Sequence, residues 1–133
     1  MTLVQVIGTA GSGRTTIMGA NAIVQALEGK KVSVFADEHK DLEPYIRANE
    51  WIKGDLENTE HPIKFSYMHR DASVSARLSA LPVSELPEVA LIDIHSLEKS
   101  VFLDAVEVHK MLSEVYKNPV VYVSIQVNRG VIG

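Results

Sequence analysis

The sequence predicts a three-layer α/β fold with a mostly parallel central sheet, and three observations predict it. Segments with strand-like and helix-like hydrophobic spacing alternate along the chain. The expected strands are mostly apolar rather than alternating, which is typical of parallel strands covered by helices on both faces. The length of 133 residues suits one hydrophobic core and is too short for two. We therefore expect residues 1–133 to form a single domain.

Five strands are expected from runs of β-branched and other apolar residues. They are residues 3–7, 32–36, 63–68, 89–94 and 120–127. The third run alternates apolar and polar side chains, which predicts a half-exposed strand. The other runs are nearly continuous in apolar residues and predict buried strands.

Helical spacing fills most of the segments between these strands. The first helix is expected to begin at Thr15. It is expected to end at Gly29, because helices often end on a glycine. On one face of this helix lie Ile17, Ala20, Val24 and Leu27. Asp41 is expected to cap a third element, which is followed by a polar surface loop over residues 53–62. Its packing residues are Tyr45, Ile46 and Trp51.

Two further helices are expected in the second half of the chain. A short one follows Asp71, and on one side it carries Val74, Leu78 and Leu81. The longest covers residues 97–117, and its core stripe consists of Val101, Ala105, Val108, Leu112 and Val115. Asn118 and Pro119 are expected to stop it, because proline cannot continue a helix.

Composition and charge exclude several classes of protein. Hydrophobic residues make up 46% of the chain and charged residues 23%, which excludes a disordered or collagen-like chain. With 13 Lys and Arg against 17 Asp and Glu, the net charge of −4 argues against a stand-alone basic nucleic-acid clamp. The absence of cysteine excludes disulfides and thiolate metal sites and fits a cytoplasmic protein. No apolar run approaches the ~20 residues of a membrane span, so no membrane association is expected.

A glycine-rich turn between the first strand and the first helix carries the strongest chemical signal. Its residues follow the phosphate-loop pattern G-x-x-x-x-G-K-[ST], and they are Gly8, Thr9, Ala10, Gly11, Ser12, Gly13, Arg14 and Thr15, with Thr16 next. Glycines let backbone N–H groups surround a phosphate, and the helix N-terminus adds a partial positive charge. The hydroxyl of Thr15 is expected to ligate Mg²⁺. Arg14 replaces the lysine of the pattern, which keeps the charge but changes its shape.

Two carboxylates are candidates for the remaining chemistry of a nucleotide site. Asp93 ends the most hydrophobic strand and is expected to help Thr15 hold Mg²⁺. Glu38 follows the second strand, at the carboxyl edge where ligands bind in open α/β sheets. It is the candidate to polarise the attacking water in hydrolysis. For each carboxylate the alternative is an ordinary structural residue, a buried strand end or a solvated acidic turn.

These segments, in this order, resemble the RecA-like ATPase core of the DnaB-type replicative helicases. Residues 3–16 resemble that family's first strand and phosphate loop. Residues 32–39 (VSVFADEH) are similar to its V-x-V-F-S-L-E-M segment, and Glu38 falls on the catalytic base. Residues 91–93 resemble its second nucleotide motif. Residues 118–129 (NPVVYVSIQVNR) are similar to its P-V-V-x-L-S-Q-L-N-R stretch, and Gln126 takes the place of the glutamine that senses the γ-phosphate.

The resemblance implies a three-layer αβα P-loop NTPase that binds ATP and Mg²⁺. Catalysis would involve Glu38, Arg14 and Gln126. The biological setting would be DNA replication or recombination, for example in a mobile element or virus. The implied partners are single-stranded DNA, a helicase or another replication protein, and further copies of the chain. The chain departs from the family pattern at Arg14, and the resemblance covers about half of it. It opens on the first strand, so we expect no N-terminal primase-interaction domain. It stops after the sensor strand, so we expect a slow or partner-dependent ATPase.

Two other functions stay open on the sequence. One is a non-catalytic module that keeps the fold and some nucleotide affinity and acts by binding a helicase or another partner. The other is a small-molecule kinase built on the same loop, which the scarcity of arginines outside the motifs disfavours. The five histidines lack metal-ligand spacing, so we expect no histidine metal site.

Overall fold

A computed structural model describes residues 2–8, 13–37, 63–68, 73–94 and 99–126. The strands are β1 (Thr2–Gly8), β2 (Val32–Asp37), β3 (Lys64–Met68), β4 (Val89–Asp93) and β5 (Val120–Gln126). The helices are α1 (Arg14–Leu27), α3 (Val74–Ser79), α4 (Lys99–Ser113) and a 3₁₀ turn at Val83–Glu85. All five expected strands are present in these positions. The element expected to begin at Asp41 and the loop over residues 53–62 lie outside the described residues.

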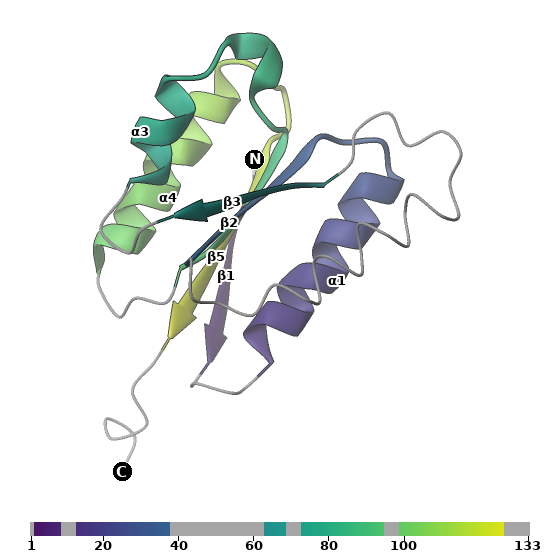
Figure 1. The fold of residues 1–133 in the computed structure, drawn as a ribbon, viewed down its shortest axis with the longest axis vertical. Coiled ribbons are helices and arrows are strands. Elements are labelled where there is room, and N and C mark those ends of the chain that lie inside the picture. Colours follow the sequence, from purple (N-terminus) through teal and green to yellow (C-terminus); the bar gives the residue numbers. More distant parts are fainter. Residues whose placement is uncertain (1, 9–12, 38–62, 69–72, 95–98, 127–133) are drawn as a thin grey trace.

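The five strands form one all-parallel sheet in the order β1-β5-β4-β2-β3. Helix α1 covers one face of this sheet, and α3 and α4 lie together over the other (Figure 1). Parallel strands need their connections on the faces of the sheet, which is why mostly apolar strands predicted this arrangement. The α/β class and the parallel sheet are confirmed. The layering agrees with a three-layer αβα fold.

The core under α1 is built from small and medium side chains. Met18, Ala22 and Ala26 of the helix are at most 3% exposed and pack on Val34 and Leu91 of the sheet. The helical face on which the sequence places Ile17, Ala20, Val24 and Leu27 points away from the sheet. Ile17, Val24 and Leu27 are 49%, 50% and 42% exposed. Gly29 follows the helix with a φ of 87°, as expected of a glycine that ends a helix.

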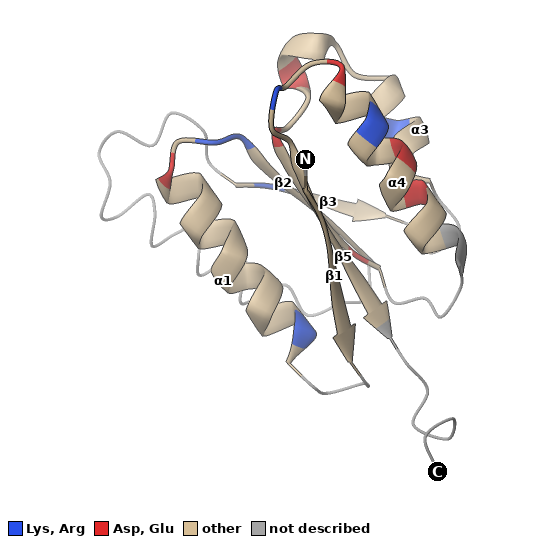
Figure 2. Ribbon diagram, turned by 180° about the vertical axis from the view of Figure 1, so that it is seen from behind, with Lys and Arg blue, Asp and Glu red and all other residues tan. Residues whose placement is uncertain are grey.

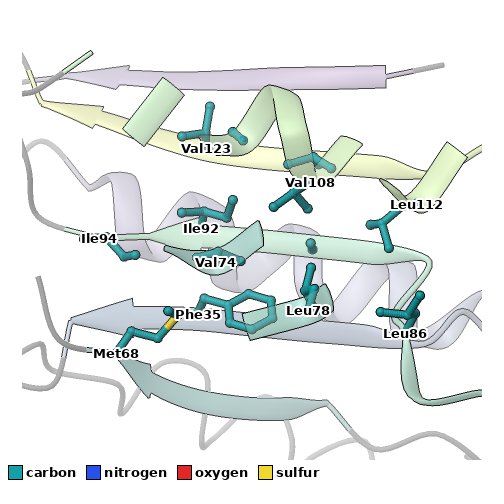
Figure 3. Packing of buried hydrophobic residues seen from close by; sticks show 13 residues of the cluster. Phe35, Met68, Val74, Leu78, Leu86, Ile92, Ile94, Val108, Leu112 and Val123 are labelled. Atoms are coloured by element: carbon teal, nitrogen blue, oxygen red, sulfur yellow. The ribbon is translucent and has the colours of Figure 1, made fainter. Parts of the chain in front are cut away.

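The second core lies between the other face of the sheet and the helices α3 and α4. Figure 3 shows Val74 and Leu78 of α3 and Val108 and Leu112 of α4 pointing toward strand residues such as Ile92. All of these side chains are at most 1% exposed. Burial of such a cluster supplies the main stabilisation of this layer.

Three expectations at the ends of elements were wrong. Helix α4 ends at Ser113 rather than Lys117, and Val115 is therefore 38% exposed instead of continuing the core stripe. Leu81 lies beyond the end of α3 and is also 38% exposed. In β3 the C-terminal Met68 is buried at 3%, whereas Tyr67 is 52% exposed, because Met68 faces the α3–α4 core.

Within the described part of the chain, no helix has the length and apolar character that crossing a membrane requires.

Candidate functional site

The carboxyl ends of the parallel strands bring the sequence-predicted residues to one edge of the sheet. Gly8 ends β1, Asp93 ends β4 and Gln126 ends β5. Gly8 and Gln126 are register partners, because β1 and β5 are paired neighbours. β5 lies between β1 and β4, so its end lies between the other two. Helix α1 begins at the same edge, which is the place where open parallel sheets bind ligands.

Gly13 forms the entry to α1. It occupies the N-cap position with a φ of 90°, in the left-handed region that side chains other than glycine rarely adopt. Its carbonyl accepts the first helical hydrogen bond, from the backbone N–H of Ile17 at 3.0 Å. The helix has no side-chain cap and no acidic residue in its first turn. Its N-terminal N–H groups and partial positive charge therefore suit an anion.

Thr15 and Asp93 meet at this helix start. The Thr15 Oγ1 hydroxyl donates a hydrogen bond of 2.9 Å to Asp93 Oδ2. Asp93 is fully buried at the end of β4, and Thr15 lies in the first turn of α1 and is partly buried. The structure thus brings together the two residues that the sequence predicts as the Mg²⁺ pair.

The donor set of this pair fits a magnesium ion. Both groups are hard oxygen donors, which Mg²⁺ prefers. Because the Thr15 hydroxyl donates its hydrogen bond to Asp93, the lone pairs of Oγ1 are left to ligate a cation. Two protein groups of this kind, with phosphate oxygens and water completing the octahedron, are a common set for Mg²⁺ bound with a nucleotide. Bound there, Mg²⁺ would neutralise phosphate charge.

Arg14 is directed onto the sheet. Its Nη1 donates a hydrogen bond of 3.0 Å to the Ser124 Oγ of β5, and the arginine is only 7% exposed. Ser124 is 1% exposed. A buried guanidinium needs polar partners, and the serine hydroxyl supplies one. Ser124 was not among the residues predicted from the sequence, although a serine within the apolar run VVYVSI of β5 was a signal for it.

The remaining predicted residues fall into three groups. Thr16 is exposed in the first turn of α1, at the same end as Thr15. Outside the described residues lie Thr9, Ala10, Gly11, Ser12 and Glu38. The backbone of Gln126 is described as the end of β5. The structure therefore tests neither the predicted water-polarising role of Glu38 nor the sensor role of Gln126.

Charge is distributed unevenly over the described elements. Between Arg14 and Glu28, α1 carries no charged residue, so the helix is tan between its two ends in Figure 2. Asp104, Glu107 and Lys110 place both signs on α4 (Figure 2). Among the described residues, no three His, Cys, Asp or Glu side chains form a group that could hold a metal ion. A cation at the sheet edge would thus depend on hydroxyl and phosphate oxygens as well as Asp93.

No protein-family model and no curated protein sequence matches this chain.

Proposed function

We propose that this protein is a minimal P-loop NTPase that binds ATP·Mg²⁺ at the carboxyl edge of its sheet, related to the RecA-like ATPase core of DnaB-type replicative helicases. The observation that carries the proposal is the hydrogen bond from Thr15 to Asp93. It joins the helix that follows the glycine-rich turn to a buried carboxylate 78 residues away. A plain glycine-rich turn would not require that contact.

Each predicted site residue has a physical role in this proposal. The N-terminal N–H groups of α1 would bind phosphate oxygens, with Gly13 setting the direction of the helix. Thr15 and Asp93 would hold Mg²⁺. Glu38 would polarise the attacking water, and Gln126 would report the γ-phosphate, as the family resemblance implies. The setting implied by that resemblance is DNA replication or recombination, with single-stranded DNA, a replication protein or further copies of the chain as partners.

The test of nucleotide binding is protection against thermal unfolding. A ligand at 100 times its dissociation constant adds about 2.7 kcal/mol to the free energy of unfolding, so ATP·Mg²⁺ should raise Tm by several degrees. Protection should weaken in EDTA and in Thr15→Ala. Sodium sulfate at equal ionic strength serves as the control. A Tm that ATP·Mg²⁺ leaves unchanged at millimolar concentration would rule out the proposal.

A second candidate function is a binding module that does not hydrolyse ATP, and the contact between Arg14 and Ser124 favours it. The basic side chain of the phosphate loop is tied to β5 and buried, rather than extended at the sheet edge. Steady-state phosphate release separates the two functions. A measurable rate that Glu38→Gln abolishes supports the ATPase, whereas nucleotide binding without turnover, with and without single-stranded DNA, supports the binding module.

A further inference from the structure

Strand β1 forms one edge of the sheet. It is the last strand in the order β1-β5-β4-β2-β3, and among the described strands it pairs with β5 alone (Figure 1). The backbone N–H and C=O groups on the outer side of such a strand can pair with another strand. We infer that this edge binds a second copy of the chain, by antiparallel pairing of β1 with β1 centred on Gln5, to form a dimer with one continuous sheet. The inference goes beyond the proposed function and does not depend on nucleotide binding.

β1 lacks the features by which edge strands usually prevent such pairing. Its sequence, TLVQVIG, contains no charged residue and no proline. All seven residues pair with β5 in one uninterrupted register, so no bulge turns this edge away. The strand at the other edge, β3, differs because it begins with the exposed Lys64. Of the two edges, β1 is therefore the better suited to pairing.

Side chains on both faces of β1 are only partly covered. None of its seven residues is buried, whereas all five residues of β4 are. Val4 and Val6 lie on the α1 face, at the border of that core. Leu3 lies on the opposite face, and so do Gln5 and Ile7, because side chains alternate along a strand. Ile7 is 57% exposed, so a neighbouring strand would remove apolar surface from water.

The order of residues makes β1 complementary to a second copy of itself. In an antiparallel pair centred on Gln5, Leu3 lies opposite Ile7, Val4 lies opposite Val6, and Gln5 lies opposite Gln5 of the second copy. Opposed residues of an antiparallel pair share a face of the sheet, so apolar side chains would meet apolar side chains on both faces. The two glutamine amides can exchange hydrogen bonds. Centring the pair on Val4 or Val6 instead would place Gln5 opposite Leu3 or Ile7.

The geometry of this pairing also predicts how the copies are arranged. Antiparallel strands direct the carboxyl edges of the two sheets to opposite ends, with Gly8 of each copy beside Thr2 of the other. The two proposed nucleotide sites would therefore lie apart. One pair of strands makes a small interface, so we expect a dissociation constant on the order of 10–100 μM.

The first experiment measures mass by sedimentation equilibrium over about 5–500 μM, which brackets this constant. Gln5→Lys and Gln5→Glu each place like charges opposite each other at the centre of the pair. Each variant alone should raise the dissociation constant at least about tenfold. An equimolar mixture of the two should recover dimers, because lysine then faces glutamate. Since Gln5 is exposed, Tm of the dilute variants should stay close to that of the unaltered protein.

The matched control puts a charge on the other edge strand. Tyr67 of β3 is 52% exposed, and Tyr67→Lys should leave the dimer unchanged. Loss of the dimer in this variant would assign the interface to β3 and overturn the inference.

The second experiment tests the register by crosslinking. The chain has no cysteine, so Gln5→Cys introduces a single thiol. In the inferred pair the two substituted residues face each other with Cα atoms about 4.5–5.5 Å apart, within the range of a disulfide. Mild oxidation should therefore produce covalent dimers. In Thr2→Cys the two thiols would lie six residues of strand apart, about 20 Å, and should not crosslink.

Three results would overturn the inference. The first is a chain that stays monomeric throughout the concentration range, which would mean that this edge is open or belongs to a different partner. The second is a dimer that Gln5→Lys leaves intact, or that the mixture of the lysine and glutamate variants does not restore. The third is crosslinking of Thr2→Cys as efficient as that of Gln5→Cys.

Discussion

The hydroxyl of Thr15 donates a hydrogen bond of 2.9 Å to the carboxylate of Asp93, across 78 residues of sequence. The contact ties the first turn of α1 to the end of β4. Because Asp93 is fully buried, its carboxyl oxygens need hydrogen-bond donors from the protein. The same pair therefore contributes to stability and supplies the oxygens of the proposed Mg²⁺ site.

Thr15→Ala should lower both stability and Mg²⁺-dependent nucleotide affinity. Removal of a donor to a charged, buried acceptor should cost about 1–3 kcal/mol in the free energy of unfolding, measured by urea denaturation. Thr15→Ser keeps the hydroxyl and should recover most of both properties. If Thr15→Ala lost stability but bound ATP·Mg²⁺ normally, the contact would be structural only.

Gly13→Ala should destabilise the protein and weaken nucleotide binding. The φ of 90° would strain any other residue by about 1–2 kcal/mol, although no heavy atom of the described residues, apart from its chain neighbours, lies within 4 Å of the added Cβ. Gly29→Ala is the matched control, because its φ is 87° and its surroundings are equally open. Both variants should lose similar stability in denaturation experiments, and only Gly13→Ala should bind ATP·Mg²⁺ less tightly. Equal affinities would remove Gly13 from the site.

Asp104 should be among the most important polar residues of the α3–α4 layer. Its carboxylate accepts hydrogen bonds from the backbone N–H groups of Val74 and Ser75, at 2.7 and 3.1 Å. It also accepts a hydrogen bond from the hydroxyl of Ser73 at 2.8 Å. Asp104→Ala removes this cap and should cost about 2–3 kcal/mol. Glu107→Ala on the same helix removes only an exposed pair with Lys110 and should change stability by less than about 0.5 kcal/mol. Equal losses in the two variants would contradict the assigned role of Asp104.

Tyr116 should make stability depend on pH in the alkaline range. Burial, with a smaller effect of the nearby Glu88 charge, raises the pKa of Tyr116 above 10.0. The folded state therefore holds the phenol proton more tightly than the unfolded state. The resulting stability is fully present below pH 10 and is lost as pH rises through the raised pKa.

The variant Tyr116→Phe provides the measurement. At neutral pH it should lose about 1 kcal/mol, because the Tyr116 hydroxyl donates to the Leu86 carbonyl at 2.6 Å. Above pH 10 the difference in stability between the variant and the unaltered protein should shrink. Tyr67→Phe, at a side chain 52% exposed, should change neutral-pH stability by less than about 0.5 kcal/mol. A difference that stays constant with pH would contradict the prediction.

Leu112→Ala should cost about 2–5 kcal/mol, because Leu112 is fully buried in the α3–α4 core. Leu103 lies on the same helix but is 62% exposed, so Leu103→Ala should cost about 0.5 kcal/mol or less. Thermal unfolding of the two variants measures the contrast. Similar Tm values would contradict the packing of α4 on the sheet.

The sequence was sufficient for the class of fold because hydrophobic period is a local property. The run Val89–Asp93 is continuous in apolar residues up to its aspartate, and such a run is typical of a strand covered on both faces. Gly29 was recognisable as the end of the first helix, and Gly13 as part of the turn before it, because glycine adopts a positive φ without strain. Thr15 and Asp93 followed from the motif spacing and the strand that ends in a carboxylate.

Other features depended on tertiary packing. With no charge between Arg14 and Glu28, α1 is apolar on more than one side, so periodicity could not select the buried face. The sheet selected the row Met18, Ala22 and Ala26, whose two alanines let the helix approach closely, over the row with Ile17, Val24 and Leu27. Similarly, α4 ended before Val115, although that residue continues the apolar spacing.

The sequence by itself therefore determined the alternation of strands and helices and the position of the glycine-rich turn. It also determined which residue types stand at the ends of the strands. Only the tertiary structure decided which of those residues meet. Strand order placed β5 between β1 and β4, and this put Ser124 within reach of Arg14. Such a contact, over 110 residues of sequence, depends on how the strands pair in space, and no local pattern of residues encodes that pairing directly.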